Sequence, residues 1–184
     1  DYLADVCAHH PDRFVGLASL PLQYVDAAIA ELDRATDDLG LRGAVLFSHI
    51  AGEPVDADRF EPFYAHAARR GVPLFVHPTV PTWGDVIRDY AMIPMMGLMV
   101  DTSIAVLRLV LSGILDRHPD LRIVHPHAGG VLPYRDCLTP QLPAFLLPGA
   151  AVLRISGSVV CHLRSLAALL ALGAAQAQTV RIGN

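Results

Sequence analysis

The sequence lacks lysine and contains few cysteines, and both features restrict what the protein can be. All 14 basic residues are arginine, 18 residues are acidic, and the formal net charge is -4. No stretch concentrates positive charge, so nucleic acid is not an expected partner. The cysteines at Cys7, Cys137 and Cys161 are far apart and form no Cys-x-x-Cys pair. They predict neither a disulfide framework nor a thiolate zinc site, and they suit the reducing cytoplasm, which is the expected location.

Long apolar runs and nucleotide-binding glycine motifs are also missing. The most apolar stretch, residues 92–110, is interrupted by Pro94, Gly97, Asp101 and Arg108. We therefore expect neither a membrane-spanning helix nor a membrane partner. No GxGxxG or GxxxxGK[ST] motif occurs, which weakens the case for a nucleotide-binding protein.

What the chain does contain is an alternation of short apolar segments and helical patterns. Apolar residues make up 53% of its 184 residues and charged residues 17%, which is typical of a folded domain with a core. The predicted strands are residues 14–19, 41–47, 73–76, 121–124, 151–155 and 179–182. The predicted helices are residues 1–10, 26–39, 58–70, 101–117 and 163–172. This order predicts an α/β fold with a parallel sheet.

A doubly wound sheet and a (β/α)8 TIM barrel both fit this order. About six strand–helix units are visible, too few for a closed barrel, so two more units before Asp1 would be needed. The chain starts without an initiator Met in what reads as the end of a helix, and it stops at Asn184 inside a predicted strand. We therefore expect a single barrel domain over residues 1–184 that is truncated at both ends.

Capping signals mark two of the predicted helices. Asp26 is expected to cap the helix of residues 26–39, and Gly40 is expected to end it. A second N-cap is expected at Asp101, Thr102 or Ser103. On this interpretation Asp101 is a helix cap rather than a catalytic acid.

Two histidines stand where predicted strands end, and they are the main candidates for chemistry. His77 follows the apolar run of residues 73–76, and His127 follows the strand of residues 121–124 and precedes Gly129 and Gly130. Ligands and catalytic groups collect at the carboxyl ends of parallel strands. A neutral imidazole there can bind zinc or a similar divalent metal, although a histidine hydrogen-bonded to the backbone is the alternative at each position.

The remaining candidates carry weaker signals. His125, two residues before His127, is expected to point the same way, so only one of them reaches the centre. His49 either lines the same cleft or is a solvated loop histidine. The irregular segment of residues 78–97 is expected to form a loop and short helix over the strand ends.

Surface positions near helix ends are expected for His9, His10, His66 and His118. Apolar pocket wall or ordinary packing are the two interpretations for Trp83, Met95 and Met96. A nucleophilic role is not expected for Cys137.

Four segments together resemble one known family. They read HPDRFVGLASLPLQ, LRGAVLF, GVPLFVHP and DTSIAVLRLVLSGILDRHPDLRIVHPHAGGVLPY, and the resemblance runs from about residue 10 to 134. They are similar to the amidohydrolase-related family, of the aminocarboxymuconate semialdehyde decarboxylase and resorcylate decarboxylase type. The resemblance implies a metal-dependent (β/α)8 barrel, usually with Zn²⁺ and sometimes with Mn²⁺, that acts as a nonoxidative decarboxylase or a hydrolase.

The resemblance also implies roles for individual residues. His77 falls on a metal ligand, and His127 falls on the histidine that activates water or shuttles a proton. His125 falls on a position that the family often fills with an apolar residue, so it inherits no role. The family's first-strand His-x-His pair and its last-strand Asp have no counterpart here, and the chain ends at Gly183-Asn184. Residues 136–164 match the family poorly.

These features lead to three functional expectations. The first is a decarboxylase of a small aromatic or muconate-like acid, and the second is a metal-dependent hydrolase of an amide, lactone or ester. The third is an inactive truncated fragment. The expected partner is a small-molecule substrate, whose binding residues the sequence leaves unknown, and the resemblance allows a homodimer.

Overall fold

The computed structural model describes residues 1–132. The strands predicted at residues 151–155 and 179–182, and the helix predicted at residues 163–172, lie outside the described residues. Cys137 and Cys161 lie outside them as well.

Four parallel strands form the centre of the described structure. They are β1 (Ala18–Ser19), β2 (Ala44–Phe47), β5 (Leu74–His77) and β6 (Ile123–Val124), and they lie in the order β1-β2-β5-β6. The order along the chain is thus the order across the sheet. A doubly wound sheet would reverse direction at a switch point, whereas a barrel adds each strand on the same side. The predicted barrel class is confirmed, and the described strands make up part of such a barrel.

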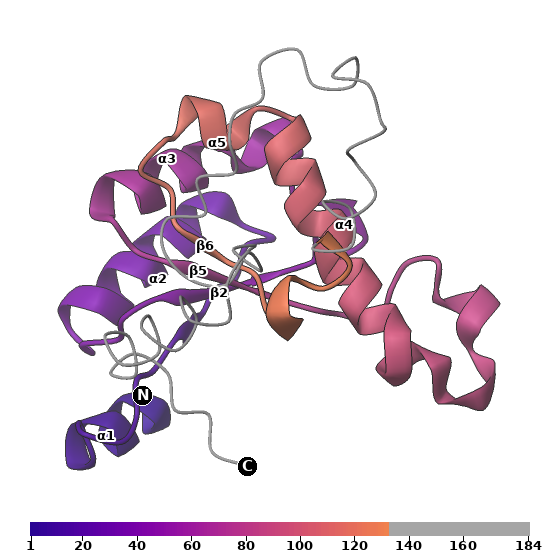
Figure 1. The fold of residues 1–184 in the computed structure, drawn as a ribbon. Helices are drawn as coiled ribbons and strands as arrows, with labels where there is room; N and C mark the ends of the chain where they lie inside the picture. The colour runs from indigo at the N-terminus through magenta and orange to yellow at the C-terminus, as the bar shows by residue number, and fades with distance from the viewer. Residues whose placement is uncertain (133–184) are drawn as a thin grey trace, which may run out of the picture.

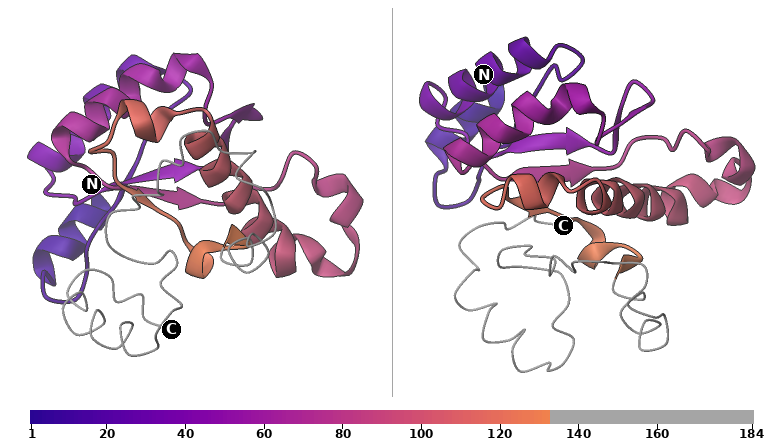
Figure 2. Two further views of the ribbon diagram at one scale, coloured as in Figure 1. Left: turned by 45° about the horizontal axis from the view of Figure 1, so that its top comes forward. Right: turned by 90° about the horizontal axis from the view of Figure 1, so that it is seen from above.

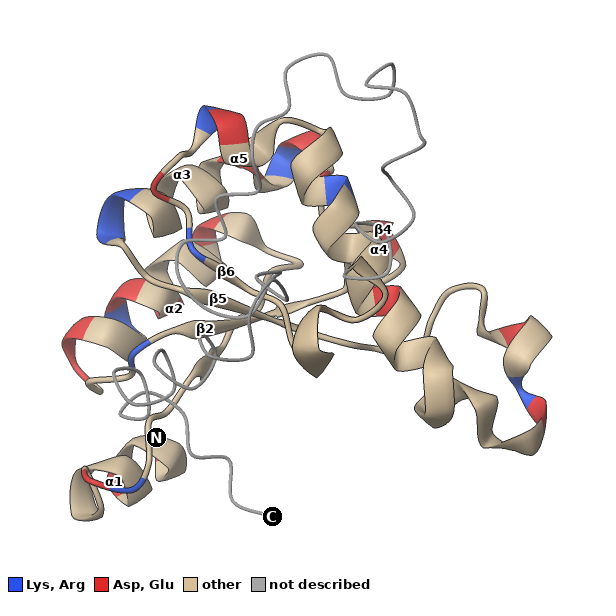
Figure 3. Cartoon of the chain, in the orientation of Figure 1, with Lys and Arg blue, Asp and Glu red and all other residues tan. Residues whose placement is uncertain are grey.

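Helices separate the strands and surround one side of the sheet. They are α1 (Tyr2–His9), α2 (Val25–Asp37), α3 (Glu61–Arg70), α4 (Leu98–Leu111) and α5 (Ile114–Arg117). In Figure 1, α2, α3, α5 and α4 follow one another in an arc around β2, β5 and β6. Positions of charged residues are spread along these helices, while the ribbon of β2 and β5 carries none (Figure 3). The charge pattern therefore separates a solvated outer layer from an uncharged sheet.

Side chains along the strands alternate between two environments. Ala44 pairs with Leu74, Leu46 pairs with Val76, and none of the four is more than 1% exposed. The intervening residues Val45 and Phe75 are only partly buried. Because successive residues of a strand point to opposite faces, one face packs under the helices and the other is the inner face of the curving sheet.

The connection between β5 and α4 is the least regular part of the described structure. It contains the short helices η2 (Gly84–Ile87) and η3 (Asp89–Ala91), followed by the π-helical η4 (Ile93–Gly97). In Figure 2 this segment reaches away from the sheet rather than over the strand ends. The predicted irregular structure with short helices is confirmed, but its predicted position over the strand ends is wrong.

The stretch Asp89–Leu111 is long and apolar enough to cross a membrane by length and composition. It is not one uniform helix, because Tyr90 has φ 56° and η4 has π-helical geometry. Its second half, α4, packs against β5 and buries Ala105, Val106 and Leu109. Packing of α4 in the core of the domain accounts for its apolar composition.

Both predicted N-caps are wrong. Tyr24 occupies the cap position of α2, and Asp26 lies inside the first turn. In α4, Asp101, Thr102 and Ser103 are buried residues of the helix itself. The reason is that η4 continues into α4 through Gly97, which has helical dihedral angles of φ -58° and ψ -45°. No open helix end exists there for a side chain to cap.

Other boundaries differ from the predictions in smaller ways. The predicted helix 101–117 is divided at Gly113, which is left-handed with φ 77° and separates α4 from α5. The predicted loop after β2 contains a small antiparallel hairpin of β3 (His49–Ile50) and β4 (Glu53–Pro54). A short η1 (Asp58–Phe60) leads into α3, which ends as predicted at left-handed Gly71.

Candidate functional site

His77 is the last residue of β5 and extends from the inner face of the sheet. Its backbone pairs with Phe47 of β2, and its side chain is exposed. The imidazole Nδ1 lies 2.8 Å from the carbonyl oxygen of Pro78. A carbonyl oxygen only accepts hydrogen bonds, so Nδ1 carries a proton, and in the neutral ring the lone pair is therefore on Nε2. This tautomer is the one that a histidine needs to bind a metal through Nε2.

Several contacts fix the backbone on either side of His77. Its carbonyl accepts a 2.9 Å hydrogen bond from the Ser48 amide, and the Thr79 amide donates to Ser48 Oγ at 3.0 Å. The hydroxyls of Ser48 and Thr79 are 3.0 Å apart. The Phe47 ring meets the imidazole edge to face, with ring centroids 5.9 Å apart. These contacts hold the end of β5 against the end of β2.

His127 lies just beyond the next strand. It begins the 3₁₀ turn η5 (His127–Gly129), which follows β6, and its side chain is exposed. The φ angles from His127 to Gly130 are 54°, 52°, 89° and 58°. Side chains strongly disfavour this region, so a strained backbone presents the imidazole. Since β5 and β6 are adjacent parallel strands, His77 and His127 occupy the same edge of the sheet.

The expectation that His125 and His127 point the same way is wrong. His125 is 2% exposed and continues the buried alternation of Ile123, while His127 has left the extended conformation. Both ring nitrogens of His125 lack a hydrogen-bond partner among the described residues. Burial, with a smaller effect from His127, lowers the pKa of His125 to about 4. His125 is therefore a neutral imidazole within the helix-covered layer, and it does not reach the inner face.

His49 does not offer a free nitrogen. Its Nε2 lies 3.1 Å from the Val80 carbonyl, and its Nδ1 accepts the Gly52 amide at 3.0 Å. It thus connects the β3–β4 hairpin to the loop after His77. The proposal of a solvated loop histidine was incomplete, since both nitrogens are used structurally.

The other histidines lie on the outside of the helices, as expected, but two of them are partly buried in ionic contacts. His66 pairs with Asp33 at 2.7 Å, and His118 pairs with Glu61 at 2.6 Å. His9, the last residue of α1, contacts the Asp5 carbonyl, and His10 directly after the helix is exposed. None of these belongs to the strand-end edge.

Among the described residues, Met95 and Met96 fit neither of the two interpretations, an apolar pocket wall or ordinary packing. Met95 is 75% exposed and Met96 is 43% exposed on the projecting segment. Trp83 is partly buried and precedes η2.

Asp101 is a buried acidic residue rather than the helix cap predicted from the sequence. It is only 6% exposed, and its Oδ2 has no hydrogen-bond partner among the described residues. An acidic residue in an otherwise apolar helical stripe was the available signal for a buried carboxylate.

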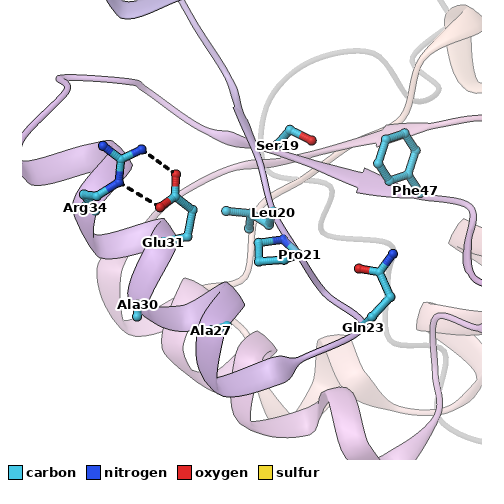
Figure 4. Close-up of a pocket in the computed structure, with 9 residues that line it drawn as sticks. All are labelled: Ser19, Leu20, Pro21, Gln23, Ala27, Ala30, Glu31, Arg34 and Phe47. Carbon is cyan, nitrogen blue, oxygen red and sulfur yellow. Dashed lines mark hydrogen bonds and ion pairs between the residues drawn. The ribbon is translucent and has the colours of Figure 1, made fainter. Parts of the chain in front are cut away.

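An open hollow of about 790 Å³ lies beside β1 and α2. Figure 4 shows Ser19, Pro21 and Phe47 on one side of it and the ion pair of Glu31 with Arg34 on the other. Neither His77 nor His127 lines it. The hollow borders β1, the edge strand of the described sheet, and is separate from the two candidate histidines.

The described residues match only part of a metal site. Among residues 1–132, no group of three or more His, Cys, Asp or Glu side chains lies close enough to hold an ion. His77 nevertheless has the exposure, tautomer and strand-end position of a ligand. It fits a divalent cation as one member of a larger ligand set.

The described sheet is parallel, has the strand order of a barrel, and has imidazoles at the carboxyl ends of adjacent strands. These features are typical of barrel enzymes that place metal-binding and proton-transfer groups at that edge. The model of the amidohydrolase family matches residues 1–152. The chain belongs to this family, and the resemblance seen in the sequence is confirmed.

Named relatives narrow the comparison. The chain is 40% identical over 146 residues to a gamma-resorcylate decarboxylase of Rhodococcus jostii, which covers 72% of this chain and 44% of the relative. It is 31% identical over 134 residues to a 2-amino-3-carboxymuconate-6-semialdehyde decarboxylase of Dictyostelium discoideum, which covers 73% of this chain and 37% of that relative. The chain therefore spans less than half the length of these relatives.

A solved structure adds a metal to the comparison. Dihydroxybenzoic acid decarboxylase of Polaromonas sp. JS666 was solved with bound manganese and the inhibitor 2-nitroresorcinol. It matches with a TM-score of 0.67 and 31% identity, and the match covers 78% of this chain and 49% of that chain. The likeness therefore extends over most of this chain and about half of that enzyme.

Proposed function

We propose that the protein is a metal-dependent nonoxidative decarboxylase of a small aromatic or muconate-like carboxylic acid. The single observation that carries this proposal is the exposed His77 side chain at a strand end, whose Nδ1–H donates to the Pro78 carbonyl and whose Nε2 has no hydrogen-bond partner among residues 1–132. The relatives support it, because those compared above are decarboxylases of such acids.

We propose that His77 binds a divalent cation, with the other ligands supplied from outside residues 1–132. Imidazole nitrogen suits zinc, which is our first assignment, and manganese is the alternative because the Polaromonas enzyme binds it. When bound, the cation supplies positive charge that attracts and polarises substrate oxygens. The Pro78 carbonyl keeps the imidazole in the tautomer that this role requires.

His127 would supply the proton in the chemical step. In a nonoxidative decarboxylation the bond between carbon and carboxylate breaks, CO₂ leaves, and the electron pair remains on the carbon. A proton must then bind to that carbon. The exposed His127 can donate it as an imidazolium and regain a proton from solvent. The apolar Phe47 beside His77 favours an aromatic substrate ring in the same space.

The test is product analysis with the purified, metal-loaded full-length protein. A panel of hydroxybenzoates and muconate-like acids is assayed for CO₂ release, and a panel of lactones, esters and amides is assayed for hydrolysis. We expect CO₂ release, and His127→Gln should lower kcat by about 10²- to 10⁴-fold. His10→Gln, at an exposed position just after the first helix, is the control and should leave kcat unchanged.

Hydrolysis without CO₂ release would instead support the second function, in which His127 acts as a base toward water. The family model itself is that of an amidohydrolase, which is the observation that favours this alternative. Activity that survives complete removal of divalent metal would contradict both.

We further propose a cytoplasmic, homodimeric protein. The partly buried Cys7 is a free thiol, which suits a reducing compartment. The projecting segment exposes Val86, Tyr90 and Met95 at 80%, 89% and 75%, a feature that favours an interface. Cell fractionation tests the location, and light scattering during gel filtration tests the dimer.

A further inference from the structure

The turn that carries His127 is held by one residue of a distant helix. Within residues 127–131, the Gly129 amide bonds to the Pro126 carbonyl and the Gly130 amide bonds to the His127 carbonyl. These bonds are local to the turn. The Val131 amide instead donates to Ser103 Oγ at 2.9 Å, across 28 positions of sequence. In the described part of the chain, this is the one hydrogen bond that ties the turn to α4.

The turn and the serine fit each other closely. Ser103 is 1% exposed, and its hydroxyl also donates to the Met99 carbonyl at 2.8 Å. A Cβ atom at Gly130 would collide with Ser103 Oγ and would lie 2.9 Å from the Met99 carbonyl oxygen. His125 Nε2 would be 3.2 Å away on the same side. Only glycine at this position lets the turn approach α4 this closely.

The backbone of the turn needs such support. Four consecutive residues have positive φ, and two of them, His127 and Ala128, are not glycine. Residues in this region persist only when their surroundings hold them there. Because the hydroxyl both donates and accepts, it fixes the distance between the first turns of α4 and the end of the His127 turn.

We propose that Ser103 is a positioning residue for His127, whose hydroxyl holds the strained turn in the conformation that presents the imidazole. The inference rests on the proposed role of His127 in proton transfer. Ser103 does not touch the inner face of the sheet and takes no part in the chemistry itself.

The helix offers a matched control at the adjacent position. Thr102 is 0% exposed and donates from Oγ1 to the same Met99 carbonyl at 3.0 Å. Its hydroxyl makes no hydrogen bond to the turn. In Ser103→Ala the Met99 carbonyl keeps its bond from Thr102, and in Thr102→Val it keeps its bond from Ser103. Each variant thus removes one of the two hydroxyls that donate to the Met99 carbonyl, but only Ser103→Ala also releases the Val131 amide.

The experiment compares Ser103→Ala and Thr102→Val in the metal-loaded full-length protein. We expect Ser103→Ala to lower kcat by about 10- to 100-fold with little change in KM, because the proton donor is misplaced. The limb of the pH–rate profile that reports the donor should shift as well. Thr102→Val should change neither. Equal losses in the two variants, or no loss in either, would overturn the proposal.

Two readouts do not depend on the reaction. Amide hydrogen exchange at Val131 should accelerate in Ser103→Ala alone. The rate at which diethyl pyrocarbonate modifies His127 should also change in Ser103→Ala alone. If the wild-type protein shows no decarboxylation, the proposed function fails and these two readouts alone decide the positioning role. Unchanged exchange and modification rates in Ser103→Ala would then contradict it.

Discussion

At the scale of single residues, the hydrogen-bond partners of each histidine decide what it can do. His77 has its Nδ1 bonded to a carbonyl, and both nitrogens of His49 are occupied. Both nitrogens of His125 lack a partner within the described part of the chain. His127 is exposed on a strained turn. Of the histidines near the strand ends, only His77 and His127 are therefore available to a ligand or substrate.

Replacing His125 tests the neutral, buried state assigned to it. Its pKa falls from 6.5 to about 4 because burial disfavours the charged ring. The unfolded chain then binds more protons than the folded one between these values, so stability falls as the pH drops from 6.5 to 4. The loss should reach about 3 kcal/mol. His125→Leu should remove this part of the acid dependence, as measured by urea unfolding at several pH values.

The control for that experiment is His10→Leu, which leaves His125 in place and should keep the wild-type pH dependence. Since the ring nitrogens of His125 have no partner in residues 1–132, leucine should cost little stability at neutral pH or even stabilise the fold. A large loss of stability at neutral pH in His125→Leu would show that the ring makes an essential polar contact.

The sequence predicted the two strand-end histidines because an apolar run followed by histidine places a side chain at the sheet edge whatever the details. It could not predict that His127 would point away from His125, since that depends on the change to positive φ at His127. The free Nε2 of His77 also depends on a backbone carbonyl that only the folded loop brings near. Asp101 was misread as a cap because the π-helical turn before it has no simple sequence signal.

At the scale of elements, a charged contact joins α3 to α5. Glu61 accepts hydrogen bonds from Arg117 at 3.0 and 2.9 Å, and His118 lies 2.6 Å from the same carboxylate. Bonding to Arg117, and then to His118, lowers the pKa of Glu61 to about 2. The contact fixes α5, which precedes β6, against α3, which precedes β5.

Glu61→Gln tests the contribution of this contact. A lowered pKa contributes stability that is present above the unfolded value of 4.5 and is lost as pH falls toward about 2. Because the Glu61 side chain is 35% exposed, solvent limits the contribution to about 1 kcal/mol or less at pH 7. The difference between wild type and variant should shrink as the pH approaches 3, as measured by urea unfolding.

The comparison is Glu31→Gln. This variant removes an acid whose ion-pair partner, Arg34, lies on the same helix. It should cost less than Glu61→Gln, because it joins no separate elements. An equal or larger cost would show that the α3–α5 contact has no special role.

Most elements were predicted from periodicity and glycine signals, and their centres are right. Three of the four strand predictions within the described residues were too long, as in residues 14–19, where only Ala18–Ser19 pairs, while the strand of residues 73–76 was shifted by one residue. Strand ends depend on whether a neighbouring strand offers a hydrogen-bond partner, and a single sequence carries little of that information. The division of α4 from α5 at Gly113 was missed because the apolar stripe continues on both sides.

At the scale of the whole molecule, the strand order decides the architecture and the site. Sequential strands lie side by side, so their carboxyl ends form one continuous edge. That edge brings His77 of β5 next to the strand that precedes His127. The sequence alone allowed two architectures, and the observed order selects the barrel. The single-domain prediction for residues 1–184 stays a prediction.

The central claim is that His77 binds a catalytic divalent metal through Nε2. The most direct test is elemental analysis of the purified full-length protein, comparing the wild type with His77→Ala and His49→Ala. His49 is the control because it also lies near a strand end but has both nitrogens occupied. The account predicts tightly bound zinc or manganese in the wild type and in His49→Ala. In His77→Ala it predicts that both the bound metal and the CO₂-releasing activity are lost. Full metal content and activity in His77→Ala would contradict it.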